Sequence, residues 1–167
     1  MKPDHVDEIL DQWQRERPDI DVSAMAILGR IARLDKTIRP RLDAVFAEHD
    51  LESWEFDVLA TLRRAGAPHQ LTPGELLRSM MVTSGAMTNR IRRLEQRGLV
   101  ARVAHPDDGR QVLVTLTQDG LQTVDAAVVA HADNQRRIVD VLDPAQRRHL
   151  ADLLRAFDLG LADHPQS

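Results

Sequence analysis

The chain has 167 residues, of which 43% are hydrophobic and 29% charged, with no cysteine and a formal net charge of −4 at pH 7. These values predict one globular domain with its own core, and they exclude a disordered chain, disulfide bonds, thiolate metal sites and binding of nucleic acid over the whole surface. The seven histidines show no metal-ligand spacing, and we find neither a membrane-spanning apolar run nor a signal peptide, so we expect a cytoplasmic protein without metal, cofactor or membrane partner.

Three amphipathic helices are expected in the first part of the chain. The first carries Trp13 on its apolar face and should end before Pro18, because the residue before a proline disfavours helical backbone. The second is expected over residues 22–48, where apolar side chains again recur at helical spacing. Ser53 is predicted to be the N-cap of the third helix, over residues 54–64.

The middle of the chain predicts a winged helix-turn-helix. The sequence TPGE at residues 72–75 has the form of a capping box and begins a short helix. Thr83 is predicted to cap a second, basic helix, which Gly98 ends. Two strands should follow over residues 99–104 and 111–116, and an Asp-Gly turn joins them into a hairpin that forms the wing.

Two further helices are expected after the wing, over residues 118–142 and from Asp143 to about residue 162. Their apolar side chains exceed what an isolated helix pair can leave in water, which predicts a homodimer interface built with the N-terminal helices. The expected organisation is one domain over residues 1–167, with a DNA-binding lobe at 51–117 and dimerisation helices at 1–50 and 118–163.

Positive charge is concentrated in the predicted helix-turn-helix and wing. Between residues 78 and 110 only three acidic side chains oppose seven arginines, which are Arg78, Arg90, Arg92, Arg93, Arg97, Arg102 and Arg110. A basic patch on an otherwise acidic chain indicates a localised DNA contact, although an acidic protein partner would also fit.

The second helix of this motif has two distinct faces. Met87, Ile91 and Leu94 share the face that should be buried. The opposite face carries side chains that can bond base edges in a major groove, and Ser84 lies near the helix start, where phosphate contacts are common. The exposed candidates are Thr88, Asn89, Arg92, Arg93 and Gln96. An ordinary solvated helix face is the alternative interpretation.

Arg90 differs from these neighbours, because it falls at the margin of the buried face. Asp57 occupies a similar margin on the third helix. A guanidinium and a carboxylate in such positions normally pair, because an unpaired buried charge is costly. The two residues therefore predict either a structural salt bridge or a polar ligand site, with Trp13 as a third wall.

The span from residue 71 to residue 120 resembles the multiple antibiotic resistance regulator (MarR) family of winged-helix repressors, and the likeness extends over nearly the whole chain. Its specific parts are RLEQRGLVAR after the basic helix, Asp-x-Arg at Asp108 and Arg110, and VLVTLTQDG. The resemblance implies a mainly α, α+β winged helix-turn-helix fold. It also implies a homodimer that binds a pseudo-palindromic operator in double-stranded DNA and is released by a small molecule.

The resemblance assigns roles to individual residues. Ser84, Thr88, Asn89 and Arg92 would read the major groove, with Arg93 nearby. Arg110 would enter the minor groove from the wing, where a narrow A·T-rich groove attracts arginine, and Asp108 would hold it in position.

A narrower resemblance concerns the effector. Trp13, Asp57 and Arg90 are similar to the residues that line the ligand site in the urate-responsive branch of the family, which implies that urate would draw the basic helix through Arg90. Another planar aromatic anion, such as a phenolic acid, is the competing effector. A constitutive repressor with a structural Asp57–Arg90 bridge is a further alternative.

Other classes of function find less support in the sequence. No nucleophile elbow, glycine-rich phosphate loop or cluster with catalytic spacing is present, so we expect no enzyme activity. A protein-binding winged helix is the stronger rival, and a steep loss of DNA affinity with salt would argue against it.

Overall fold

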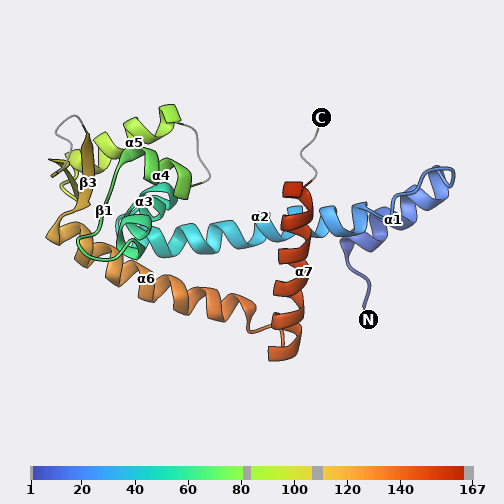
Figure 1. The fold of residues 1–167 in the computed structure, drawn as a ribbon. Helices are drawn as coiled ribbons and strands as arrows, with labels where there is room; N and C mark the ends of the chain where they lie inside the picture. The colour runs from blue at the N-terminus through green and yellow to red at the C-terminus, as the bar shows by residue number, and fades with distance from the viewer. Residues whose placement is uncertain (1, 81–83, 107–110, 164–167) are drawn as a thin grey trace.

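The computed structural model describes residues 2–80, 84–106 and 111–163. Helices and strands α3 to β3 form a rounded lobe, from which α2 and α6 extend in contact with each other, while α1 lies beyond the far end of α2 (Figure 1). In chain order the elements are α1 (His5–Glu16), α2 (Met25–Glu48), α3 (Ser53–Arg64), β1 (Gln70–Leu71), α4 (Pro73–Ser79), α5 (Ser84–Gln96), β2 (Val100–Ala104), β3 (Val112–Leu116), α6 (Gln118–Val139) and α7 (Pro144–Asp163).

The predicted capping box of α4 is present. The Thr72 backbone N–H donates to Glu75 Oε2 at 2.8 Å, and the Glu75 backbone N–H donates to Thr72 Oγ1 at 3.2 Å. Asp143 likewise accepts hydrogen bonds at the start of α7, from the backbone N–H groups of Ala145 and Gln146 at 2.8 and 2.9 Å. These short-range bonds define helix starts that the sequence pattern had predicted.

Two predicted helix starts were wrong by a few residues. The second helix begins at Met25 rather than residue 22, because Asp21 Oδ1 accepts from the Ser23 backbone N–H at 2.9 Å and forms a turn first. The N-cap of α3 is Glu52 rather than Ser53, since Glu52 has extended backbone and its N–H donates to the Glu55 side chain at 2.9 Å. The predicted cap Thr83 lies outside the described residues.

The wing belongs to a small antiparallel sheet with the strand order β1-β3-β2. The predicted hairpin is formed by β2 and β3, with Ala104 opposite Val112. Strand β1 adds Gln70 opposite Thr115, and the sequence missed it because two residues are too short to show alternation. The architecture is therefore the predicted mainly α winged helix-turn-helix.

The core lies within the lobe, and it joins the lobe to α6. The completely buried side chains come from α3, α4, α5, the sheet and α6, and they include Val58, Leu59, Leu62, Leu76, Leu94, Val114 and Val124. Because these residues pack in one shared core, α5 and the wing are held in fixed positions relative to α3 and α6.

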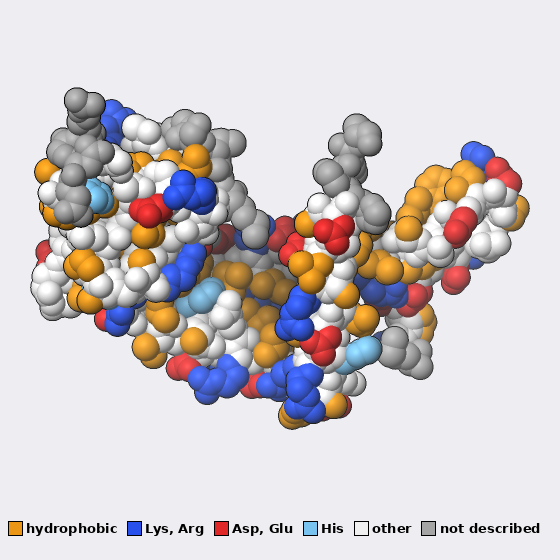
Figure 2. Space-filling model, in the orientation of Figure 1, with side chains coloured by type: hydrophobic (Ala, Val, Ile, Leu, Met, Phe, Trp, Pro, Cys, Tyr) orange, Lys and Arg blue, Asp and Glu red, His pale blue; other side chains and the backbone are white. Residues whose placement is uncertain are grey.

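The helices outside the lobe leave much apolar surface exposed. Helix α7 has no buried residue. Its apolar side chains are exposed in the single chain, and they are among those that the sequence predicts to form a homodimer interface. Figure 2 shows hydrophobic side chains along α7 and in the hollow between α7 and the lobe. The exposed ones on α2 and α7 include Met25, Ile27, Leu28, Ile31, Leu34, Leu150, Leu153, Leu154, Phe157 and Leu161. Among the described residues, no helix is long and apolar enough to cross a membrane.

Candidate nucleic-acid interface

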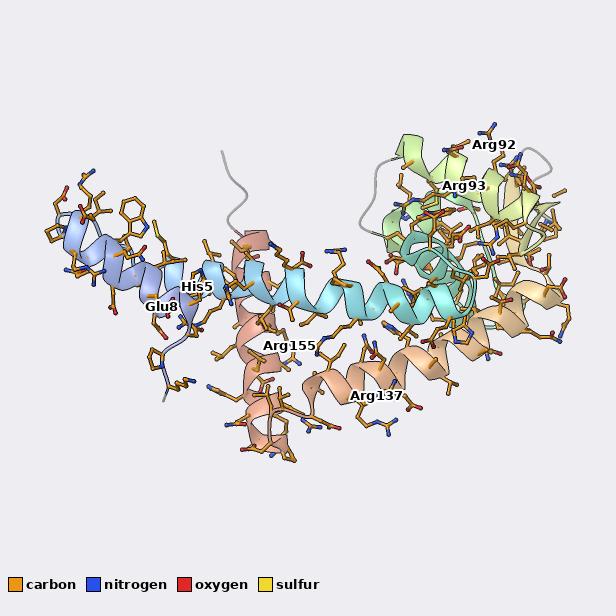
Figure 3. All side chains as sticks on the ribbon, turned by 180° about the vertical axis from the view of Figure 1, so that it is seen from behind. His5, Glu8, Arg92, Arg93, Arg137 and Arg155 are labelled. Carbon is orange, nitrogen blue, oxygen red and sulfur yellow. The ribbon has the colours of Figure 1, made fainter. Side chains whose placement is uncertain are left out.

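Helix α5 presents the polar face that its sequence predicts. Met87 and Ile91 are 2% and 1% exposed, whereas Thr88, Asn89 and Arg92 are exposed. The Arg92 guanidinium donates to Asn89 Oδ1 at 2.9 Å, and Arg92 lies at the outer edge of the lobe (Figure 3). This bond holds together a guanidinium and an amide, which are the two groups best suited to bond guanine and adenine.

The wing tip was predicted to carry the minor-groove contact. Asp108 and Arg110 lie outside the described residues, as does the side chain of Ser84, the first residue of α5. The His105 backbone N–H donates to the Gln111 carbonyl at 3.0 Å. This bond lies next to β2 and β3, the two strands of the predicted hairpin.

Two other arginines, Arg93 in α5 and Arg97 directly after it, turn towards the start of α3. Arg93 donates to Glu52 Oε1 at 2.5 Å and lies over the Trp54 ring, 4.7 Å from its centroid. Arg97 donates to the buried carboxylate of Glu55 at 2.5 Å. Arg93 was predicted to lie on the DNA face, and the sequence did not indicate these partners because they are more than forty positions away along the chain.

The two residues of the predicted polar site, Asp57 and Arg90, do not bond each other. No ion pair or hydrogen bond between these described side chains is present, and the buried Arg90 Nη1 has no partner. Arg90 instead lies 5.6 Å from the centroid of the Trp54 ring. The predicted direct bridge is therefore absent from this structure, and one polar atom of Arg90 remains free to bind another group.

His131 on α6 adds a third ionisable group beside Asp57. Its ring lies 4.9 Å from that of Phe46 and 5.0 Å from that of Phe56, and its Nδ1 is buried without a partner. Burial lowers the pKa of His131, although the Asp57 carboxylate partly opposes this. Sequence analysis missed His131, but its helical spacing from the buried Val124 would have indicated an inward position.

The Asp57 side chain reaches solvent, yet the surrounding helices still remove part of its hydration. Burial raises the pKa of Asp57, while attraction to Arg90, Arg64 and His131 acts in the opposite direction. The net direction shows that loss of hydration outweighs the nearby positive charges, so the ionised carboxylate is unfavourably placed in the free protein.

Trp13, the third predicted member, lies apart from this group within one chain. Helix α1 packs against α2, where Val6 is buried beside Gly29, and α1 lies at the end of α2 opposite to the lobe (Figure 1). The Trp13 side chain is 41% exposed there. Within a single chain, Asp57 and Arg90 therefore lie in the same region of the lobe, whereas Trp13 lies outside that region.

We expect Asp57→Asn to increase stability slightly at neutral pH. Because the folded-state pKa of Asp57 is raised, the folded protein binds more protons than the unfolded chain just above the ordinary value of 3.8, and stability falls as pH rises through that window. Urea unfolding should show the gain at neutral pH and its loss below the ordinary pKa. Asp11→Asn, an exposed change on α1, serves as the control, and destabilisation by Asp57→Asn alone would contradict the expectation.

Known proteins resemble this chain in sequence and in fold. Residues 49–111 match the sequence profile of the MarR family. The HTH-type transcriptional regulator PecS of Dickeya dadantii is 38% identical over 159 residues, which span 95% of this chain and 96% of PecS.

Two solved structures of DNA-binding proteins are similar to this chain. A mutant MarR from E. coli, in complex with operator DNA, superposes with a TM-score of 0.70 and 28% identity, covering 83% of this chain and 99% of that one. BpsR of Bordetella bronchiseptica, whose DNA binding is regulated by 6-hydroxynicotinic acid, gives a TM-score of 0.63 and 28% identity, covering 77% and 92% of the two chains.

Proposed function

The chain belongs to the MarR family of DNA-binding transcriptional regulators, and we propose that it is a repressor that a small aromatic anion releases from its operator. Its relatives are regulators rather than enzymes, in agreement with the sequence prediction. The observation that carries the proposal is the exposed Asn89–Arg92 pair on α5, beside a wing, in a fold similar to that of an operator-bound protein.

In this proposal the protein acts as a homodimer of one-domain chains, each spanning residues 1–167. Residues 51–117 form the DNA-binding lobe, and the helices within 1–50 and 118–163 form the dimer interface. The exposed apolar side chains of α2 and α7 support this division, because a second copy would remove them from water. A two-fold dimer would then present two α5 helices to the two halves of a pseudo-palindrome.

Each lobe would bind DNA through two elements. Thr88, Asn89 and Arg92 would bond base edges in the major groove, and Ser84 would contact phosphate or a base at the helix start. Arg110, held by Asp108, would enter the adjacent minor groove. Arg93 is left out of this set, because its guanidinium is bonded to Glu52.

The effector would bind between Asp57 and Arg90. An anion can accept a hydrogen bond from the free Arg90 Nη1, and an effector with N–H groups can donate to the Asp57 carboxylate. Urate offers an anion and several N–H donors on one planar ring system, whereas a phenolic acid offers a carboxylate and a single O–H donor. The partner's Trp13 would supply the aromatic wall, since α1, the helix that carries Trp13, lies at the far end of α2 in the same chain.

The coupling between effector and DNA would pass through α5 itself. Arg90 leaves the same helix as Asn89 and Arg92, so an anion that draws Arg90 also moves the residues that face the groove. Only a ligand that binds the displaced position of α5 more tightly can shift the population away from the DNA-bound form.

We expect urate to weaken operator binding, and Arg90→Gln to reduce that response by about tenfold or more, because it removes a charged hydrogen-bond donor. Fluorescence anisotropy on DNA from upstream of the protein's own gene would measure both effects, with millimolar urate or benzoate added. Arg92→Ala is the control for DNA binding and should lose operator affinity with or without urate. Release by benzoate and not by urate would identify the competing class of effector.

A constitutive repressor is the second candidate, and tight binding that no anion changes would establish it. DNA affinity that does not fall with salt would instead favour a protein-binding winged helix, because phosphate contacts by arginine release counterions.

A further inference from the structure

Glu52, Trp54 and Arg93 form a closed set of contacts between α3 and α5. One carboxylate oxygen of Glu52 accepts from Arg93 at 2.5 Å, and the other accepts from Trp54 Nε1 at 2.7 Å. The Arg93 guanidinium also lies 4.7 Å from the centroid of the Trp54 ring. Each of the three side chains therefore orients the other two, and the Glu52 carboxylate is the member that accepts hydrogen bonds from both of the others.

Glu52 is charged when it makes these contacts. The hydrogen bonds from Trp54 and Arg93 lower the pKa of Glu52, so its carboxylate is ionised at neutral pH. The Arg93 side chain nevertheless remains 47% exposed. The guanidinium is thus accessible to solvent, and its position against α3 depends on the charge of Glu52 and on the face of the Trp54 ring.

Arg93 and Arg92 are neighbours in sequence but lie differently on the lobe. Arg92 bonds Asn89 of its own helix at the outer edge, whereas Arg93 lies nearer the centre of the lobe (Figure 3). A cation that reached a DNA phosphate would add affinity for every sequence alike, because counterion release does not depend on the bases. Holding Arg93 on α3 leaves the outward face of α5 to the side chains that bond base edges.

We propose that Glu52 is a specificity-determining residue, which holds Arg93 against Trp54 and so keeps this cation from binding DNA phosphates of any sequence. The inference rests on the proposed binding of α5 in the major groove. In this arrangement Arg93 is a positioning residue, since it fixes α5 on α3 rather than touching DNA. Sequence-independent affinity is thereby kept low, which matters because non-specific sites far outnumber operators.

Glu52→Gln tests the proposal, because glutamine retains an acceptor for Trp54 Nε1 but loses the charge that binds Arg93. We expect affinity for a mixed-sequence duplex to rise about threefold or more, and the slope of log affinity against log salt to steepen by about 1.8 per dimer, from one added phosphate contact per chain. Affinity for the operator should rise less, because its base contacts need a fixed α5. Anisotropy titrations between about 50 and 200 mM salt measure both slopes.

Glu8→Gln is the matched control. It removes the same charge from α1, where Glu8 pairs with His5 at 3.0 Å far from the lobe (Figure 3), and its salt slope should equal that of the unchanged protein. Arg93→Gln should also leave the salt slope for the mixed-sequence duplex unchanged, and this variant decides the matter if Glu52→Gln fails to fold.

Two results would overturn the inference. One is a salt slope for Glu52→Gln equal to that of Glu8→Gln, and the other is a shallower slope for Arg93→Gln, which would show that Arg93 touches phosphate. Either result would leave the proposed function standing, provided that Arg92→Ala still loses operator affinity.

Discussion

Gly120→Ala is expected to destabilise the protein by about 3 kcal/mol or more, which corresponds to a fall of about 10 °C in the melting temperature. A Cβ at this position would lie 1.9 Å from the carbonyl oxygen of Leu99 and 2.9 Å from its carbonyl carbon. Both atoms belong to the backbone, so no side-chain rotation can relieve the overlap. Thermal unfolding followed by circular dichroism measures the effect.

The close approach of Gly120 joins the lobe to α6. Thr117 Oγ1 accepts from the Gly120 N–H at 3.0 Å and donates to the Gly98 carbonyl at 2.7 Å, while the Thr117 N–H donates to Leu99. A larger residue at position 120 would therefore push the backbone of Leu99, which follows α5, away from the start of α6. We expect DNA affinity to fall even where the variant remains folded, because the two lobes of the proposed dimer must keep a fixed separation.

Gly74→Ala is the control for the glycine substitution. A Cβ at Gly74 would make only ordinary contacts, the nearest being 3.6 Å from the Arg78 side chain, so this variant should match or exceed the original stability. Equal stability of both alanine variants would show that the backbone at Leu99 can move aside.

Arg97→Ala is expected to cost about 3 kcal/mol or more, because it leaves a buried carboxylate without its cation. Glu55 is 1% exposed, and its Oε2 accepts from Arg97 at 2.5 Å. Arg97 also donates to the Asp50 carbonyl at 2.6 Å and to its carboxylate at 2.7 Å. Urea unfolding of the variant measures the loss.

A double-mutant cycle separates the charge effect from lost packing. Adding Glu55→Gln to Arg97→Ala should recover part of the stability, since it removes the unpaired charge that the first change leaves behind. Arg17→Ala is the control, because its pair with Asp19 is exposed on both sides and should contribute less than about 1 kcal/mol. A double variant no more stable than Arg97→Ala would mean that Arg97 acts through its bonds to Asp50 instead.

The sequence predicted most of the fold because its signals are short-range. The capping box at Thr72 and Glu75 and the cap at Asp143 depend on residues within three positions of each other, and the hairpin joins two strands that are adjacent in sequence. The same holds for the faces of α5, since helical geometry alone puts Met87 inward and Asn89 outward. Strand β1 escaped prediction because it exists only through its pairing with β3.

The candidate sites were predicted less completely, because their contacts join distant parts of the chain. Sequence position separated Arg90 from the outward face of α5, but one of the two alternatives that it left open, a direct bridge to Asp57, does not form. It grouped Trp13 with them, although α1 lies at the other end of α2. His131 entered this region only when α6 packed beside Phe46 and Phe56.

The sequence by itself determined a winged helix-turn-helix with a basic, two-faced helix, because periodicity, caps and turns act within a few residues. Only the tertiary structure decided which arginines in and directly after α5 face outwards. Arg93 and Arg97 meet Glu52 and Glu55 from the start of α3, forty-one and forty-two positions earlier in the chain, whereas Arg92 has only Asn89 of its own helix as a partner. Charges pair through space rather than along the chain, so arginines in and directly after one helix face outwards or bond to another helix according to what packs beside them.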